Sequence, residues 1–204
     1  MHDVTHSHAG ARDRLERQLA FLVEADRLKG VLRQTTLCDR SRAENSAEHS
    51  WHLALAALVL AEHAPDVDGA RVLRMLLVHD LVEIDAGDAF AYDASANVGL
   101  EERERAAAAR IYGLLPEDQA EELRELWDEF EAGETRAARV AVAIDRLQPL
   151  LLNHHSGGGS WKAHGVGRAA VMRRMAPIEA ALPSLWPTVL DVVERNCALG
   201  HIAP

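Results

Sequence analysis

A histidine and an aspartate, His79 and Asp80, stand next to each other at the end of an apolar run that extends from Arg71 to Val78. A folded chain buries such a run, and the two polar side chains at its end are buried with it. A buried imidazole and a buried carboxylate cost free energy unless each has a partner. A divalent cation can bind both groups at once. Any fold of this chain therefore has to bring a cation, or matching polar groups, to this dipeptide.

Two further polar residues have similarly apolar neighbours. His49 precedes the dipeptide, within residues 48–55, and Asp145 follows it, after the stretch Val-Ala-Val-Ala-Ile. Together with the dipeptide they supply two imidazoles and two carboxylates, a mixed nitrogen and oxygen set that suits zinc, manganese, cobalt, nickel or iron. An ion pair of Asp145 with Arg139 or Arg146 is the alternative that needs no metal.

The order of these residues, His, then His-Asp, then Asp, resembles the HD-domain metal-dependent phosphohydrolases. Residues 79–88, His-Asp-Leu-Val-Glu-Ile-Asp-Ala-Gly-Asp, are similar to the extended signature of the branch that contains the bacterial and human 5'-deoxynucleotidases. Residues 44–50 resemble the first-ligand motif of that branch, and the likeness covers about residues 15 to 180. The resemblance implies an all-α, single-domain helical bundle of about seven to nine helices. It also implies one metal site held by His49, His79, Asp80 and Asp145.

The position of Glu83 fits this implied site. Glu83 follows His79 by four residues and Asp80 by three, so a helix returns it to the same face. Adjacent residues can both point at one ion only where a helix ends or is distorted, so we expect the helix to end near Glu83. The matching glutamate of the family acts as a general base or orients the attacking water. A glutamate exposed at a helix end is the alternative.

Two more residues receive roles from the resemblance. Asp88 follows Gly87 in an expected turn, and the family likeness implies a catalytic carboxylate there; an aspartate that caps the turn is the alternative. Arg33 lies at about the distance before the first ligand at which the family has a phosphate-binding arginine. Gln34 follows it, where the bacterial deoxynucleotidases have a tryptophan that packs against the nucleoside. This departure leaves the nucleotide specificity open.

The number of metal ions follows from an absence in the sequence. Between Asp80 and Asp145 there is no histidine. Enzymes of this family that hold two metals take additional histidines from that interval. We therefore expect one divalent ion per site, and the sequence leaves open whether it is Mn, Co, Zn, Ni, Fe or Mg.

Composition limits the partners and the location. The net charge is −10, from 22 basic and 32 acidic residues, and no basic stripe is visible, so we expect no nucleic-acid polymer as partner. The longest apolar stretch, Ala54 to Ala61, is too short to span a bilayer, so no membrane association is expected. Cys38 and Cys197 are far apart and unpatterned, as in proteins with free thiols. These features predict a cytoplasmic protein.

The chain is expected to have a disordered tail at residues 1–11 and one domain at residues 12–204. Aromatic residues make up only 4% of the chain, and the abundance of Ala and Leu favours helices over strands. Residues 29–43 are expected to form a loop, and no strand is predicted. Helices are predicted at about residues 12–28, 45–63, 68–83, 98–113, 117–131, 135–154, 168–181 and 184–199.

The set of candidate metal ligands and the family resemblance imply a metal-dependent phosphomonoesterase, a 5'-nucleotidase that hydrolyses (deoxy)nucleoside 5'-monophosphates to nucleoside and phosphate. One alternative is a non-catalytic regulatory module that binds metal and nucleotide, and another is a helical bundle in which the His and Asp residues pair internally. The resemblance also implies a homodimer, for which Trp127 and Trp186 on two late helices are candidate interface residues.

Overall fold

The computed structural model describes residues 4–93, 95 and 98–204, with the backbone alone for residues 4–9. Eight of the described α-helices have ten or more residues, within the predicted number. The α-helices are α1 (Val4–Ala25), α2 (Ser46–Val59), α3 (Gly69–Val78), α4 (Glu83–Ala86), α5 (Leu100–Tyr112), α6 (Glu117–Ala132), α7 (Arg136–His155), α8 (Gly159–Ala163), α9 (Arg168–Ala181) and α10 (Trp186–Ala198). Short 3-10 helices are η1 (Asp26–Gly30), η2 (Ala61–His63), η3 (His79–Val82) and η4 (Pro183–Leu185).

Several helices begin at a residue whose side chain caps the first turn. Asn45 accepts a hydrogen bond from the backbone N of Glu48 at 2.9 Å, and the Glu48 carboxylate accepts one from the backbone N of Asn45 at 2.7 Å. This reciprocal pair is the capping box that the sequence predicts for α2. Asp68 caps α3 with its side chain alone, accepting from the backbone N of Ala70 at 3.0 Å. Hydrogen bonds from capping side chains therefore fix where α2 and α3 begin, and both helices lead to the site.

Two predictions about the first 45 residues are wrong. Residues 29–43 are not a plain loop, because strands β1 (Leu32–Thr36) and β2 (Ala43–Asn45) pair in an antiparallel hairpin. The tail expected at residues 1–11 is helical from Val4 onwards, and residues 1–3 lie outside the described residues. The hairpin matters for function because it holds Arg33 in a fixed strand beside the start of α2.

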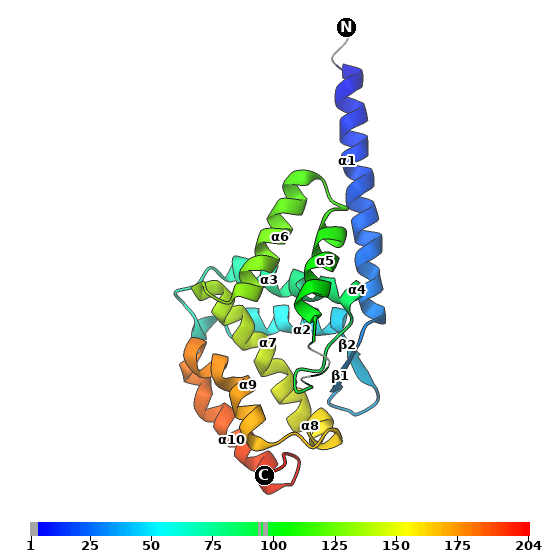
Figure 1. Ribbon diagram of the computed structural model, residues 1–204. Helices are drawn as coiled ribbons and strands as arrows, with labels where there is room; N and C mark the ends of the chain where they lie inside the picture. Colours follow the sequence, from blue (N-terminus) through cyan, green and yellow to red (C-terminus); the bar gives the residue numbers. More distant parts are fainter. Residues whose placement is uncertain (1–3, 94, 96–97) are drawn as a thin grey trace.

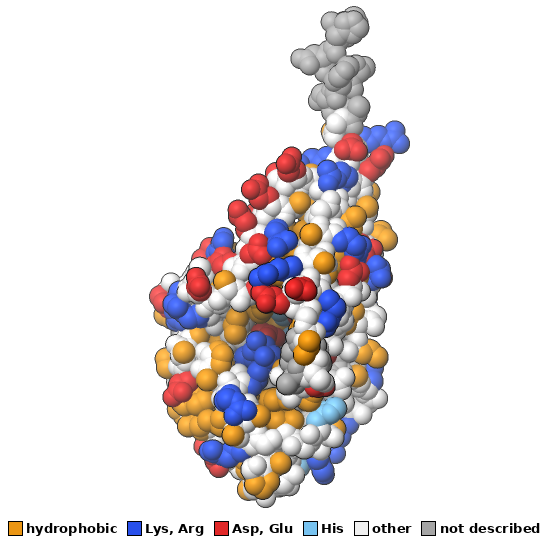
Figure 2. Space-filling view, viewed as in Figure 1, with side chains coloured by type: hydrophobic (Ala, Val, Ile, Leu, Met, Phe, Trp, Pro, Cys, Tyr) orange, Lys and Arg blue, Asp and Glu red, His pale blue; other side chains and the backbone are white. Residues whose placement is uncertain are grey.

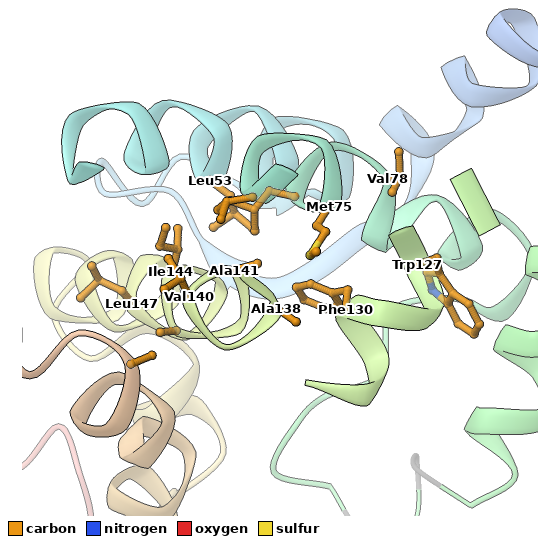
Figure 3. Packing of buried hydrophobic residues seen from close by; sticks show 14 of the residues in the cluster. Leu53, Met75, Val78, Trp127, Phe130, Ala138, Val140, Ala141, Ile144 and Leu147 are labelled. Atoms are coloured by element: carbon orange, nitrogen blue, oxygen red, sulfur yellow. The ribbon is translucent and has the colours of Figure 1, made fainter. Parts of the chain in front are cut away.

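Helix α7 lies at the centre of the bundle and packs against α2, α3, α6 and α9. Ala138 and Ala141 on α7 are fully buried, and such small side chains let neighbouring helices approach closely. Leu53 of α2 and Met75 of α3, both fully buried, lie over this part of α7 (Figure 3). The core thus brings together the three helical segments that contain the predicted metal ligands.

The remaining helices extend this centre in two directions. Helix α1 projects beyond α5 and α6 at one end of the molecule, and α9 and α10 lie at the other end, near the C-terminus (Figure 1). Trp127 of α6 is 3% exposed and belongs to the core, so the prediction that it serves a dimer interface is wrong. In the described part of the chain, none of the helices combines the length and apolar character needed to cross a bilayer.

Candidate metal centre and active site

The helix that contains the dipeptide changes its geometry where the dipeptide begins. α3 ends at Val78, and residues 79–82 continue as the 3-10 helix η3. A 3-10 helix has three residues per turn, so the side chains of residues three apart are aligned. The side chains of Asp80 and Glu83 therefore lie on the same side of this segment, and the carboxylates of both are close to Nη1 of Arg33. The sequence predicts that the helix ends near Glu83, but α3 ends at Val78, and Glu83 begins the short helix α4.

The four predicted metal ligands meet in the interior of the protein. Nε2 of His49 lies 3.0 Å from Oδ1 of Asp145 and 3.9 Å from Oδ2 of Asp80. Nε2 of His79 lies 3.0 Å from Oδ1 of Asp80 and 3.8 Å from Oδ1 of Asp145. All four side chains are buried. Helices α2 and α7 and the 3-10 helix η3 thus bring residues that are far apart in sequence to one point.

The orientation of both imidazoles is set by hydrogen bonds at Nδ1. His49 donates from Nδ1 to Oε1 of Gln148 at 3.1 Å, and His79 donates from Nδ1 to the carbonyl of Leu76 at 3.1 Å. In the neutral form of each ring, Nε2 is then the atom with the lone pair, and each Nε2 points toward carboxylate oxygens. An acceptor for the N–H of the remaining ring nitrogen is the arrangement typical of metal-ligating histidines.

A divalent cation fits this donor set. Nε2 of His79 is buried and has no aligned hydrogen-bond partner, although Oδ1 of Asp80 is only 3.0 Å away. Burial alone would lower the pKa of His79, but the nearby charges of Asp80 and Asp145 raise it to about 10, so the cluster strongly favours positive charge. One ligand atom from each of His49, His79 and Asp145 lies within 4.8 Å of the others, the span expected around a single ion.

Arg33 of β1 connects the metal cluster with the other predicted site residues. Its Nη1 donates to Oδ2 of Asp80 at 2.9 Å and lies 3.8 Å from Oε1 of Glu83 and 3.7 Å from Oδ1 of Asp88. On the other side of the guanidinium, Nε lies 3.7 Å from Oε2 of Glu44. The three predicted residues Arg33, Glu83 and Asp88 are therefore next to the four ligands.

The surroundings of Glu83 keep its carboxyl group close to protonation. Burial, followed by the charge of Asp80, raises the pKa of Glu83 well above its ordinary value. Ser46, at the start of α2, donates from its hydroxyl to Oε2 of Glu83. A carboxyl group of raised pKa that is held beside a metal cluster is suited to accept and return a proton.

Asp88 reaches Arg33 because the chain turns at Gly87. The backbone of Gly87 has φ of 76° and ψ of 156°, a conformation that residues with a Cβ rarely adopt. The turn ends α4 and brings the next residue back toward the hairpin. Burial raises the pKa of Asp88, and the charge of Arg33 opposes that rise. The sequence predicts a turn over residues 85–88, but Asp85 and Ala86 belong to α4, and the chain changes direction at Gly87.

Reasoning from the sequence gave no role to two residues that contact the site, Gln148 and Glu44. Gln148 accepts from His49 and also donates from Nε2 to Glu44, which is 2% exposed. Arg146 forms an ion pair with Asp145, which is the contact that the sequence suggested as an alternative to a metal. The Asp145 carboxylate therefore has one arginine and two histidines as neighbours. Spacing offers one signal for Gln148, since it follows Asp145 by three residues on the same helix. Glu44 begins the first-ligand motif.

A cavity of about 250 Å³ opens beside the cluster. Arg33, Glu83 and Asp88 form one side of it, and Arg146 and Arg174 belong to the opposite helices, α7 and α9. Figure 2 shows Lys and Arg side chains, in blue, inside a hollow of this face, with hydrophobic side chains around it. This volume is below the range of about 300 to 1,000 Å³ common for ligand pockets, which suits a small molecule rather than a polymer.

Comparison with known proteins agrees with this geometry. A family model described as HD domain matches residues 25–186. The chain belongs to the HD domain family. The family and the all-α fold that the sequence predicts are confirmed, and membership implies a divalent metal at the cluster.

Named relatives of this HD domain protein are hydrolases. The human 5'-deoxynucleotidase HDDC2 (Homo sapiens) is 32% identical over 148 residues, which are 72% of this chain and 70% of the human chain. The crystal structure of a predicted metal-dependent phosphohydrolase from Magnetospirillum magnetotacticum MS-1 is similar, with a TM-score of 0.89 and 53% identity over 94% of this chain and 100% of that chain. A conserved hypothetical protein from Pyrococcus furiosus, 20% identical, shares the fold with a TM-score of 0.59 over 87% of this chain and 97% of that chain.

Proposed function

We propose that this HD domain protein is a metal-dependent 5'-nucleotidase that hydrolyses deoxynucleoside 5'-monophosphates to nucleoside and phosphate. The observation that supports it best is the meeting of His49, His79, Asp80 and Asp145 beside Glu83, on a chain related to a 5'-deoxynucleotidase. A module that only binds nucleotide has no use for a carboxyl group of raised pKa next to its metal ligands. The placement of Glu83 therefore favours turnover over the regulatory alternative.

The four ligands would hold one divalent ion. When bound, the ion supplies Lewis acidity to a phosphoryl oxygen and lowers the pKa of a coordinated water. Two imidazole nitrogens with carboxylate oxygens suit Mn, Co, Zn, Ni or Fe, and Mg remains a candidate. Gln148 and the Leu76 carbonyl hold the two imidazoles in the orientation that leaves Nε2 free.

Each of the remaining residues of the site has its own role in the proposed reaction. Glu83 accepts a proton from the attacking water, while Ser46 holds its carboxyl group in position. Asp88 lies near the mouth of the cavity, where it can contact the water or the sugar. Arg33 is placed to stabilise charge on the phosphate while keeping the three neighbouring carboxylates together.

A second hollow provides room for a nucleoside. It shares Gln34, Asp88, Phe90 and Tyr92 with the first cavity and continues to His164. The rings of Phe90 and His164 lie 4.4 Å apart between centroids, which makes an aromatic wall. Such a wall can pack against a base, in place of the tryptophan that Gln34 replaces.

Phosphate release tests the proposal. Deoxynucleoside monophosphates are supplied with each candidate metal to wild type, to Asp80→Ala and to Glu83→Gln. We expect Asp80→Ala to lose metal and activity, and Glu83→Gln to keep its metal but lose about 100- to 10,000-fold in kcat. Glu102→Gln, an exposed glutamate on α5, serves as the matched control. Phosphate release by Asp80→Ala at the wild-type rate would refute a metal-dependent reaction at this cluster.

We propose that the protein is a homodimer in the cytoplasm. Both cysteines are free, as suits a reducing compartment. Since Trp127 is buried, the exposed apolar residues of α1 and α2 are the better interface. They are Leu15, Leu19, Leu22, Val23, Trp51, Leu55, Leu58 and Val59. Analytical ultracentrifugation of wild type and of Leu19→Glu tests this, and a monomeric wild type would contradict it.

A further inference from the structure

Arg174 of α9 lies in the wall of the cavity and is only partly exposed. Within residues 4–93, 95 and 98–204, its guanidinium has neither an ion pair nor a hydrogen bond. An arginine carries five N–H donors and a charge that is not lost near neutral pH. A guanidinium that lines a cavity and has no partner can use these donors and this charge to bind an anion.

The charges around Arg174 favour the binding of an anion. Burial, and then the neighbouring positive charge of Arg146, lower the pKa of Arg174 to about 10. The charge of Asp145 opposes this effect, but the Asp145 carboxylate already contacts Arg146 and the two histidines. Two cations on neighbouring helices therefore face one space, and an anion between them would relieve their repulsion.

The other two arginines of the cavity already have carboxylate partners. Arg33 lies within 4.0 Å of four carboxylates, and Arg146 is paired with Asp145. Their charges mainly balance the acidic residues of the metal cluster. Arg174 is the arginine of this wall whose charge is not balanced by a contacting carboxylate, and it belongs to a different helix from the metal ligands.

We propose that Arg174 binds the phosphate group of the substrate, and that α9 thereby supplies a phosphate subsite that the metal cluster alone does not provide. The inference rests on the proposed function, because it takes the anion to be a phosphate monoester. The planar guanidinium can give two parallel hydrogen bonds to two phosphate oxygens, which an ammonium group cannot do. Arg174 lines the same cavity as the predicted ligands His79, Asp80 and Asp145, so a phosphate bound there can contact both.

Binding of inorganic phosphate tests the subsite without turnover. Phosphate is titrated calorimetrically into metal-loaded wild type, Arg174→Met and Arg174→Lys, after their metal content has been shown to be equal. Arg173→Met is the matched control, because Arg173 is the adjacent residue on α9 and is exposed. We expect Arg174→Met to weaken phosphate binding by about 10- to 100-fold, Arg174→Lys to restore part of it, and Arg173→Met to leave it unchanged.

Steady-state kinetics then separates the subsite from the proposed reaction. In Arg174→Met we expect the KM for a deoxynucleoside monophosphate and the inhibition constant of phosphate to rise together, while the inhibition constant of the free nucleoside stays the same. Phosphate binding that is equal in wild type and Arg174→Met, or absent from wild type, overturns the inference. A loss of nucleoside affinity instead of phosphate affinity overturns it as well. If wild type hydrolyses no nucleotide, the proposed function fails, and the phosphate titration still decides the role of Arg174.

Discussion

His49 donates a hydrogen bond from Nδ1 to Oε1 of Gln148, with the two atoms 3.1 Å apart in the interior of the protein. Gln148 in turn donates from Nε2 to Glu44 and to Nδ1 of His52. The imidazole is thereby held in one orientation and one tautomer, with Nε2 directed at Asp145. Gln148, which is not among the predicted ligands, thus fixes the orientation of the predicted ligand His49.

Substitution of Gln148 by leucine should weaken metal binding. The variant keeps the volume of the side chain but leaves Nδ1 of His49 without its acceptor, and losses of about 10- to 100-fold in metal affinity are typical of such changes. Competition with a chromophoric chelator measures the affinity. Gln119→Leu is the control, because Gln119 is a glutamine bonded to Gln18 away from the cluster. Equal affinities of Gln148→Leu and wild type would contradict the role of this hydrogen bond.

Removal of the metal should lower the thermal stability. The ligands come from α2, η3 and α7, so an ion that binds only the folded state joins three segments of the core. At metal concentrations 100 to 1,000 times the Kd, we expect chelation to lower Tm by about 5 to 15 °C. Differential scanning calorimetry measures the shift. In Asp145→Asn protein the shift should be much smaller, and a shift of the same size there would place the stabilising ion elsewhere.

The hydroxyl group of Tyr112 stabilises the place where α3 ends. Tyr112 is 1% exposed and donates to the carbonyl of Val78 at 2.9 Å, immediately before the dipeptide His79-Asp80. Tyr112→Phe leaves that carbonyl buried without this donor, at a cost of about 1 to 3 kcal/mol in the free energy of unfolding. Urea denaturation followed by circular dichroism measures the loss. An unchanged midpoint would show that another group satisfies the carbonyl.

The stability of the metal-free protein should depend on pH through Glu104. Burial, and then the nearby Glu131, raise the pKa of Glu104 from its ordinary value of 4.5 to about 7. Between these two values the folded state binds more protons than the unfolded state, so this group makes stability fall as pH rises from about 4.5 to 7. Glu104→Gln removes the group, so its unfolding free energy relative to wild type should increase over that range.

Urea titrations at about pH 5 and about pH 8 measure this difference, because the first value lies near the lower end of the range and the second lies above its upper end. Glu102→Gln, on the exposed surface of the same helix, controls for the general effect of removing a carboxylate. A difference between Glu104→Gln and wild type that is the same at both pH values would show that Glu104 titrates at its ordinary pKa.

Local signals in the sequence predicted much of the helical structure. The capping box of Asn45 and Glu48 and the cap at Asp68 involve residues at most three positions apart, so their hydrogen bonds depend little on the rest of the fold. The site residues were predicted by family resemblance, and the structure brings all seven of them together. Their order along the chain was informative because each ligand lies in an apolar stretch.

Contacts between distant segments could not be predicted in this way. Gln148 and Arg174 resemble ordinary helical polar residues, and only the packing of α7 and α9 shows that one contacts a ligand and the other lines the cavity. The strand Leu32–Thr36 has no regular alternation of apolar and polar residues and is stabilised by pairing with β2. Similarly, the apolar face that contains Trp127 could meet either the core or a partner chain.

Pro149 lies inside α7, four residues after Asp145. Because proline has no amide hydrogen, it cannot complete the helical hydrogen bond to the carbonyl of Asp145, and its ring crowds that turn. The backbone is therefore more compliant at this aspartate than elsewhere in a regular helix. We therefore expect small displacements of the Asp145 carboxylate to cost less than in a regular helix, which would let the site take cations of different ionic radius.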